Sequence, residues 1–279
     1  DARPGGMMAR TGRGEALGAV TIVNATATGV GCSLAVNLRT TATWTPGGEG
    51  LRVTGAPDLQ LVEAVAAEMG ADLGAVVAIN CPLPASRGLK TSSSVAAALI
   101  RAVLDVDGAP ADDATVEGLA VAACRRAKVT ITGALDDQMA VVRGGCQLVD
   151  TNAGVRLASI ASPPWQVALW VPDAAIAKAD AGSLDVTSLR PSVESAIALA
   201  RDGRVAEAMT VNGEAFHASY AAADLPVDDH PTRLALSKGA LGAGLSGTGP
   251  AVAALFDRRV DLAPVAGGAW RWTRTVPGR

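Results

Sequence analysis

A run of polar residues in the segment SRGLKTSSSVAAAL, residues 86–99, has the chemistry of an anion-binding site. Lys90 is followed by four consecutive hydroxyl side chains, at the start of an alanine-rich stretch that is predicted to be helical. The N-terminus of a helix presents unpaired N–H groups and a partial positive charge, so phosphate oxygens fit there. Gly88 lets the backbone approach a ligand closely. The four hydroxyl residues are Thr91, Ser92, Ser93 and Ser94.

A plain helix cap is the alternative explanation for this segment. One Ser or Thr is enough to cap a helix, so four hydroxyls and a lysine exceed that need. A lysine at a helix N-terminus is unfavourable for the helix dipole. Lys90 therefore has no capping role to lose, and we expect Lys90→Ala to leave the melting temperature unchanged or slightly higher. The residues alone leave both explanations open.

Two widespread glycine motifs do not fit the sequence. A Walker loop requires G-x-x-x-x-G-K-[ST], but Pro84 and Leu89 stand where its two glycines should be. Residues 242–247 have the G-x-G-x-x-G spacing of a dinucleotide-binding motif. That motif must follow a strand and open a helix, whereas here an apolar strand comes after it and Pro250 blocks a helix. We therefore reject both motifs.

Hydrophobic periodicity and turn residues predict the elements that must position these segments. Residues 32–44 alternate in the manner of a strand, and the turn residues 45–50 predict a hairpin to 51–55. Residues 239–249 are expected to form a glycine-rich loop. Further strands are predicted at 19–25, 75–80, 144–152, 165–172, 250–256 and 270–275, and helices at 57–70, 91–105, 113–128, 191–201 and 204–221. This mixture of elements indicates an α+β fold.

Composition excludes several classes of protein. The chain has 279 residues, 49% of them hydrophobic, and a formal net charge of −3, which argues against nucleic acid as a partner. We find no apolar run long enough to span a membrane, and no apolar core of a secretory signal near the N-terminus. The four cysteines form no C-x-x-C pair. We expect reduced thiols in a cytoplasmic protein.

Two segments resemble the GHMP kinases, which include galactokinase, homoserine kinase and mevalonate kinase. PLPASRGLKTSSSVAAAL (82–99) is similar to the phosphate loop of that superfamily, and GLSGTGPAVAALF (244–256) to its C-terminal glycine motif. Within the superfamily the resemblance is nearest to the archaeal-type shikimate kinases. The lysine in GLKTSSS and the segments 20–38 and 129–151 carry this second resemblance, which spans residues 14 to 256 in order.

The resemblance implies a two-lobed fold with the active site in the cleft between the lobes. The N-terminal lobe would cover residues 1–155, and the C-terminal lobe, with the glycine motif 244–250, residues 156–279. It also implies ATP and Mg²⁺ as cofactors and shikimate as the partner, whose 3-hydroxyl would receive the γ-phosphoryl group. The residues implied in ATP binding are Pro84, Gly88, Leu89, Lys90, Thr91, Ser92, Ser93, Ser94, Gly247, Thr248 and Gly249.

The adjacent carboxylates of TGALDDQ, residues 132–138, are the implied catalytic groups together with Lys90. Similarity to galactokinase places Asp136 as the base towards the acceptor hydroxyl, with Asp137 as the alternative. A helix cap would also explain an aspartate here, but a cap needs only one of the two. Some family members bind the metal ion through a glutamate before this segment. Residues 122–130 contain no acidic residue, so Ser93 and Asp136 are expected to hold Mg²⁺ with the phosphates.

The acceptor side is less defined by the sequence. The resemblance places Asn24, Thr28 and Gly29 beside the acceptor. An acceptor carboxylate calls for an arginine or a lysine, and the sequence does not select one. The candidates are Arg39, Arg143, Lys178 and Arg190. Two other functions stay open: a different small-molecule kinase of this superfamily, such as homoserine kinase, and a non-catalytic relative that binds a metabolite.

Overall fold

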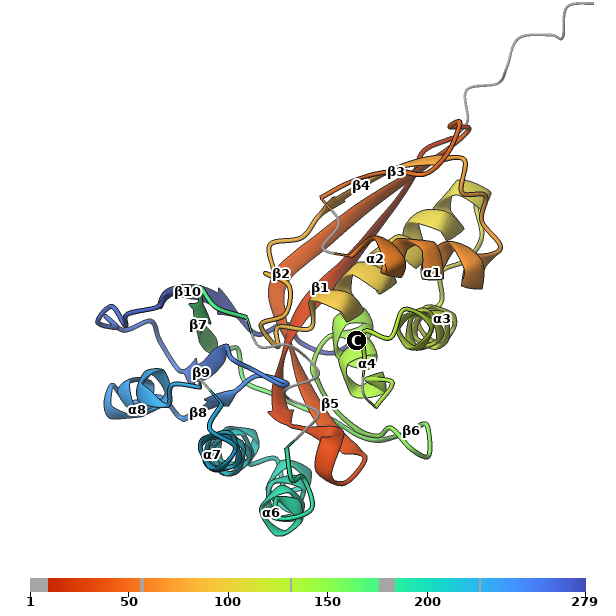
Figure 1. Cartoon of the computed structure of the whole chain (residues 1–279). Helices are drawn as coiled ribbons and strands as arrows, with labels where there is room; N and C mark the ends of the chain where they lie inside the picture. The colour runs from red at the N-terminus through yellow and green to blue at the C-terminus, as the bar shows by residue number, and fades with distance from the viewer. Residues whose placement is uncertain (1–9, 56–57, 131, 176–183, 226) are drawn as a thin grey trace, which may run out of the picture.

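Two β-sheets, one of six strands and one of four, form the frame of the protein (Figure 1). This computed structural model describes residues 10–55, 58–130, 132–175, 184–225 and 227–279. The strands of the first sheet are β1 (Gly12–Val23), β2 (Val30–Pro46), β3 (Arg52–Thr54), β4 (Ala75–Asn80), β5 (Cys146–Asp150) and β6 (Val155–Ile160). The strands of the second sheet are β7 (Gln166–Pro172), β8 (Gly242–Leu245), β9 (Val252–Phe256) and β10 (Gly268–Arg274).

The long strand β2 organises the first sheet. It pairs antiparallel with β1 along one edge, from Gly12↔Trp44 to Val23↔Cys32. Along the other edge it pairs with β4 at one end and with β5 at the other. The order of the sheet is β3-β4-β2-β5-β6, with β1 on β2, and the order of the second sheet is β10-β7-β9-β8.

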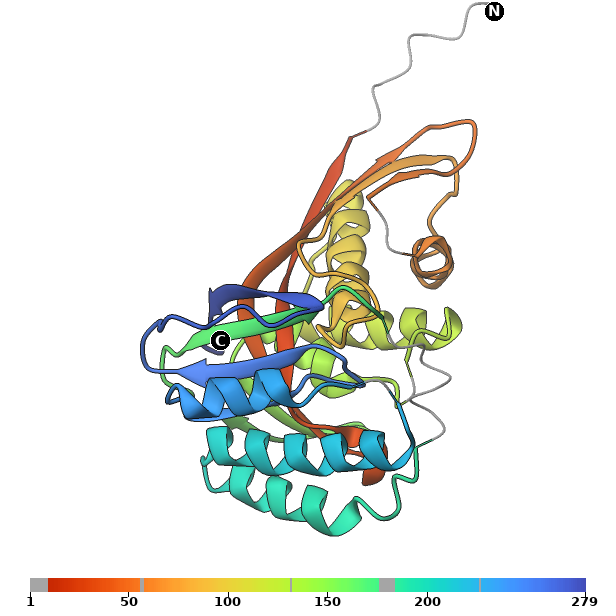
Figure 2. The same ribbon diagram turned by 60° about the vertical axis from the view of Figure 1, so that its left-hand side comes forward.

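The helices form two groups (Figures 1 and 2). The helices beside the first sheet are α1 (Leu59–Met69), α2 (Thr91–Asp107), α3 (Asp113–Arg126) and α4 (Leu135–Arg143). The other group is α6 (Arg190–Arg201), α7 (Val205–Ala222) and α8 (His230–Ser237). Of these, α8 contacts the second sheet, α7 contacts β8 and β1, and α6 contacts α7 and the strands β1, β2 and β6 of the first sheet. A short turn, η1 (Ala25–Ala27), follows β1. No helix in the described part of the chain is both long and apolar enough to cross a bilayer.

The alanine-rich composition of α2 is explained by how closely β1 approaches it. A Cβ on Gly12 or Gly14 would lie 2.0 Å from the carbonyl oxygen of Ala102 or Ala98, so only glycine fits at both positions. A hydrophobic cluster joins this face of the sheet to α1–α4. A second cluster joins the opposite face to β7, β9, α6 and α7, so it contains residues of both sheets.

Several element predictions are confirmed and others are wrong. The strand at 75–80 and the helices at 91–105, 191–201 and 204–221 agree with β4, α2, α6 and α7 to within two residues at each end. The predicted hairpin across residues 45–50 is wrong, because β3 pairs in parallel with β4. The predicted loop 239–249 contains the strand β8. The α+β fold class is confirmed, while the division of the chain at residues 155 and 156 stays a prediction.

Candidate active site

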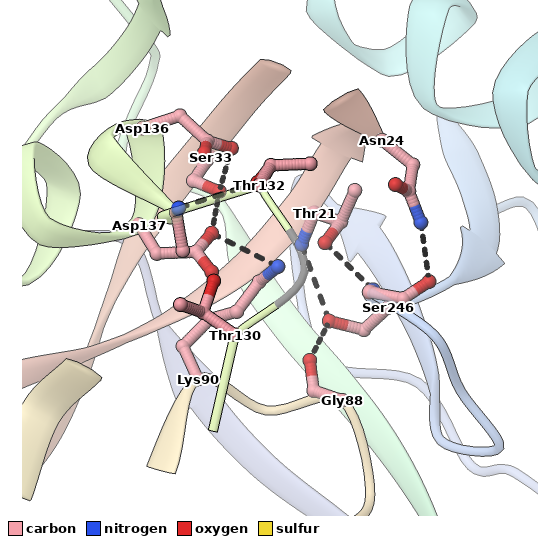
Figure 3. Close-up of polar contacts among 12 residues, drawn as sticks. Thr21, Asn24, Ser33, Gly88, Lys90, Thr130, Thr132, Asp136, Asp137 and Ser246 are labelled. Carbon is pink, nitrogen blue, oxygen red and sulfur yellow. Dashed lines mark hydrogen bonds and ion pairs between the residues drawn. The ribbon is translucent and has the colours of Figure 1, made fainter. Parts of the chain in front are cut away.

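A cavity lies where β1, α2, α4 and the β8–β9 loop come together. Four segments form its described wall: residues 23–26, the loop and first turn from 86 to 93, parts of 124–137, and 247–248. The residues that the sequence singled out therefore meet at one place, although they lie more than 200 positions apart in the chain. Figure 3 shows the polar contacts among them.

The loop before α2 has a backbone that requires glycine at one position. Gly88 has φ +79°, and a Cβ on it would lie 1.7 Å from the carbonyl oxygen of Ser246. The Ser246 hydroxyl in turn donates to the Gly88 carbonyl at 2.8 Å. Lys90 follows in the left-handed region with φ 60° and precedes the first turn of α2 without a side-chain cap. The N–H groups of that turn are thus left for a ligand.

The four hydroxyls of this loop divide into two pairs. Thr91 donates to the carbonyl oxygen of Pro84 at 2.9 Å, and Ser94 donates to the hydroxyl of Thr40 on β2 at 2.7 Å. These two bonds hold α2 to its own loop and to the sheet. Ser92 and Ser93 line the cavity, and neither hydroxyl is bonded to another described residue. They are the pair available to a ligand.

Asp136 and Asp137 lie in the first turn of α4 and are 3% and 9% exposed. The Ser33 hydroxyl, from β2, lies 2.7 Å from Asp137 Oδ1 and 3.1 Å from Asp136 Oδ2. Lys90 Nζ forms an ion pair with Asp137 Oδ1 at 2.9 Å (Figure 3). The residue before this turn, Ala134, provides no side-chain cap. Both aspartates therefore line the cavity, and contacts with Ser33 and Lys90 keep their carboxylates in place.

The two carboxylates differ in their electrostatic surroundings. Burial, together with the nearby Asp137 carboxylate, raises the pKa of Asp136 to about 7, against the opposing effects of Lys90 and Ser33. A carboxyl group with a pKa close to neutral can accept a proton from a hydroxyl at physiological pH. Asp137 instead has its charge matched by Lys90.

The glycine motif is joined to β1 by reciprocal hydrogen bonds. The Gly247 N–H donates to the Thr21 hydroxyl at 2.6 Å, and the Asn24 side-chain amide donates to the Gly247 carbonyl at 2.9 Å. Tyr220, on α7, donates to the Thr248 carbonyl at 2.6 Å. These bonds fix the loop 246–249 against the end of β1 and against α7.

Most of the predicted site residues lie on the cavity wall. They are Asn24, Gly88, Leu89, Lys90, Thr91, Ser92, Ser93, Asp136, Asp137, Gly247 and Thr248. Five others are not among the described residues that line it: Pro84, Ser94, Thr28, Gly29 and Gly249. These residues form hydrogen bonds within the protein. For example, the Gly29 carbonyl accepts from the Thr151 hydroxyl, and the Gly249 N–H donates to the Ser246 carbonyl.

The candidate partners for an acceptor carboxylate are not on the described wall. Arg39 pairs with Glu15, Arg143 with the buried Glu117, and Arg190 with Glu194. Lys178 lies outside the described residues. Lys90 is the only lysine or arginine among the described residues that line the cavity.

Sequence reasoning missed several residues of the site. Ser33 is in the middle of an alternating strand, where nothing distinguishes it from a buried small residue. Thr130 and Thr132 line the cavity and accept hydrogen bonds from the N–H groups of Gly133 and Ala134 at 3.1 and 3.2 Å. A glycine preceded by closely spaced threonines was the only available signal.

Oxygen donors on the wall fit a magnesium ion that is shared with phosphates. The described residues contain no group of three or more His, Cys, Asp or Glu that could hold a metal ion by themselves. Mg²⁺ commonly uses one or two carboxylates, the phosphates of its substrate and water. The hydroxyl of Ser93 and the carboxylate of Asp136 suit that mode of binding.

An uncapped helix N-terminus, two free serines and a lysine–aspartate cluster are parts suited to a phosphoryl-transfer enzyme. Residues 59–145 match the family described as GHMP kinases N terminal domain, and residues 193–267 match GHMP kinases C terminal. Many solved structures share the fold, among them two that cover nearly the whole chain. They are the L. major mevalonate kinase in complex with R-mevalonate (TM-score 0.71, 17% identity, covering 96% of this chain and 97% of that one) and the Cytophaga hutchinsonii homoserine kinase (0.71, 15%, 100% and 98%).

Curated relatives with higher sequence identity indicate a group within this family. A shikimate kinase of Thermococcus kodakarensis is 37% identical over 262 residues, covering 90% of this chain and 94% of its own. A shikimate kinase of Pyrococcus abyssi is 33% identical, with 90% and 93% covered. The chain therefore belongs to the GHMP kinase family and, within it, to the group that contains these archaeal shikimate kinases.

Proposed function

We propose that this protein transfers the γ-phosphoryl group of ATP to the 3-hydroxyl of shikimate, giving shikimate 3-phosphate. The observation that carries the proposal is the cluster of Lys90, Asp136 and Asp137 beside the uncapped N-terminus of α2. The choice of shikimate as the acceptor rests on the shikimate kinases that the chain resembles over about nine-tenths of its length. A non-catalytic relative would have no need of this buried carboxylate pair.

ATP would bind with its phosphates along residues 88–93 and against the glycine motif 247–249. The N–H groups of the first turn of α2, the hydroxyls of Ser92 and Ser93, and Lys90 are the groups offered to phosphate oxygens. Pro84, Ser94 and Gly249 would act indirectly, since they shape the loops behind the wall. In phosphoryl transfer the protein mainly positions the partners and balances charge, and this arrangement does both.

Magnesium would be held by Ser93 and Asp136 together with the phosphates. When bound, Mg²⁺ neutralises the charge that develops on the phosphate oxygens. Asp136 is then shared between metal binding and proton transfer, whereas Asp137 and Lys90 form a separate ion pair.

Asp136 is the proposed base towards the 3-hydroxyl, and Asp137 is the alternative. The raised pKa and deep burial of Asp136 support this assignment. Lys90 would keep Asp137 in place and face the transferring phosphoryl group. Asn24 is the proposed acceptor-side residue on the wall, and Thr28 and Gly29 would support the turn that follows it.

An assay with a panel of acceptors tests the proposal. ADP release should be measured with MgATP and shikimate, homoserine, mevalonate or galactose in turn. We expect turnover with shikimate and none with the other three. Turnover with homoserine but not with shikimate would overturn the proposed acceptor and leave the fold and family unaffected. The absence of turnover with any acceptor would favour a non-catalytic relative.

The lobe boundary is also proposed, near residue 155. Residue 155 is the first residue of β6, which ends the first sheet at Ile160, and the second sheet begins with β7 at Gln166. A boundary between Ile160 and Gln166 therefore keeps β6 with its own sheet. Because one hydrophobic cluster contains residues of both sheets, the two lobes would unfold together.

A further inference from the structure

The carboxylates of Asp136 and Asp137 lie against one strand, β2, and not only against their own helix. Successive residues of a strand point to opposite faces. Cys32, Leu34 and Val36 belong to the hydrophobic core on one face of β2. Gly31 and Ser33 alternate with them, and both are next to the carboxylates.

Gly31 provides room for one carboxylate. A Cβ on Gly31 would lie 2.5 Å from Asp136 Oδ2 and 2.7 Å from its Cγ, closer than any side chain allows. Gly31 does not have a left-handed φ, so alanine is compatible with its backbone. The glycine is therefore explained by the position of the Asp136 carboxylate, not by a turn.

Ser33 provides the contact that joins both carboxylates. Its side chain is fully buried and is not part of the described cavity wall, so it does not touch a substrate. A hydroxyl has one proton to donate, and the shorter of the two contacts, at 2.7 Å, is to Asp137 Oδ1, the oxygen that Lys90 also contacts. With Oδ1 held by two donors, the other oxygen of Asp137 is left for the cavity. Figure 3 shows Ser33 between the two aspartates.

We propose that Gly31 and Ser33 are positioning residues of the reaction: together they form a support on β2 that sets where the two carboxylates stand. The inference rests on the proposed function only in assuming that the carboxylates act in the transfer, and it holds for whichever acceptor the enzyme uses. Misplacing a catalytic group by about 1 Å can cost about 100-fold in rate.

Gly31→Ala and Ser33→Ala test the proposal. Gly31→Ala should displace the Asp136 carboxylate and lower kcat by about 100-fold, with little change in KM for ATP or in melting temperature. Gly118→Ala is the matched control, because an added Cβ there meets nothing within 4 Å. It should keep full activity and melt at the same temperature or higher.

Two further variants separate positioning from folding. Ser33→Thr keeps a hydroxyl and should recover most of the activity that Ser33→Ala loses, whereas Ser33→Cys, a weak donor, should not. Gly31→Ala added to Asp136→Asn should cost little more than Asp136→Asn alone, because both act through one carboxylate.

Parental kcat in both Gly31→Ala and Ser33→Ala would overturn the inference. Losses that multiply fully in the double variant would also overturn it, because they would show that Gly31 acts independently of Asp136. If the parent enzyme did not phosphorylate shikimate but did phosphorylate another acceptor in the panel, the result would contradict the proposed function and leave this inference untouched. The variants would then be compared with that acceptor.

Discussion

At the scale of residues, the two aspartates of α4 have different partners and should respond differently to the loss of charge. Asp136→Asn keeps the shape and removes the basicity, so kcat should fall by about 10²–10⁴-fold, the usual scale of general acid–base catalysis. Asp137→Asn should chiefly remove the ion pair that positions the Lys90 side chain. Steady-state kinetics of both variants with MgATP and shikimate measures the difference. Normal turnover in Asp136→Asn and none in Asp137→Asn would reverse the two roles.

The Lys90–Asp137 ion pair changes what is expected of Lys90→Ala. The helix dipole alone predicts an unchanged or higher melting temperature. The lysine and aspartate side chains are only 10% and 12% exposed, however, and removing one partner leaves a buried charge unmatched. We therefore expect Lys90→Ala to lose about 3 kcal/mol of stability without ligand.

A double-mutant cycle checks this expectation. Lys90→Ala combined with Asp137→Asn should be more stable than Lys90→Ala alone, because the second change removes the unmatched charge. Denaturant unfolding of the four proteins without ligand gives the coupling energy. Additive effects would mean that the pair contributes nothing to folding.

At the scale of elements, we expect the first turn of α2 to contain two kinds of hydroxyl: Ser92 and Ser93 would bind the ligand, whereas Thr91 and Ser94 bond within the protein. Ser93→Ala should leave the melting temperature without ligand nearly unchanged and reduce the stabilisation by MgATP, which follows mass action. Thr40→Val is the contrasting variant, because it removes the partner of Ser94 behind the wall. It should lose about 1 kcal/mol of stability and keep the shift with MgATP. The same ligand-induced shift in Ser93→Ala and the parent would indicate that Ser93 is only part of the helix.

The contact between α7 and α8 makes stability depend on pH. Burial lowers the pKa of His217 to about 4 from its ordinary value of 6.5, and the ring contacts the Thr232 hydroxyl at 3.0 Å. Between these values the unfolded chain binds the proton and the folded chain does not. Stability should therefore fall as the pH drops from about 6.5 to about 4.

His217→Gln tests the assignment. Because glutamine does not titrate, the variant should lose much of the decline that the parent shows over this interval. Urea unfolding at several pH values between 4 and 7.5 provides the measurement. An equal decline in both proteins would show that other groups govern acid stability.

Elements with strong local signals were predictable from the sequence, and elements defined by distant contacts were not. α3 begins after Asp112, whose side chain accepts from the Thr115 N–H, as a helix cap is expected to do. The glycines of β8 predict a loop, whereas the structure has a strand there. A Cβ on Gly242 would lie 2.0 Å from the Ala206 carbonyl, and one on Gly244 would lie 2.8 Å from Gly213 Cα, so these glycines allow α7 to pack on the strand.

At the scale of the whole molecule, the cavity depends on contacts between segments that are remote in sequence. Thr21 of β1 accepts a hydrogen bond from Gly247, and Ser246 donates one to Gly88 in the loop before α2. The sequence identified both loops through their resemblance to known motifs. It could not identify Ser33, because the two aspartates that its hydroxyl contacts lie 103 and 104 positions further along the chain.

The position of the transferred phosphate tests the central claim most directly. The purified protein should be incubated with MgATP and shikimate, and the product examined by phosphorus–proton correlation NMR. We predict a single product that carries phosphate on the 3-hydroxyl, formed by the parent and, within the same time, hardly at all by Asp136→Asn. Phosphate on another hydroxyl, no product from shikimate, or equal product from Asp136→Asn would contradict the account.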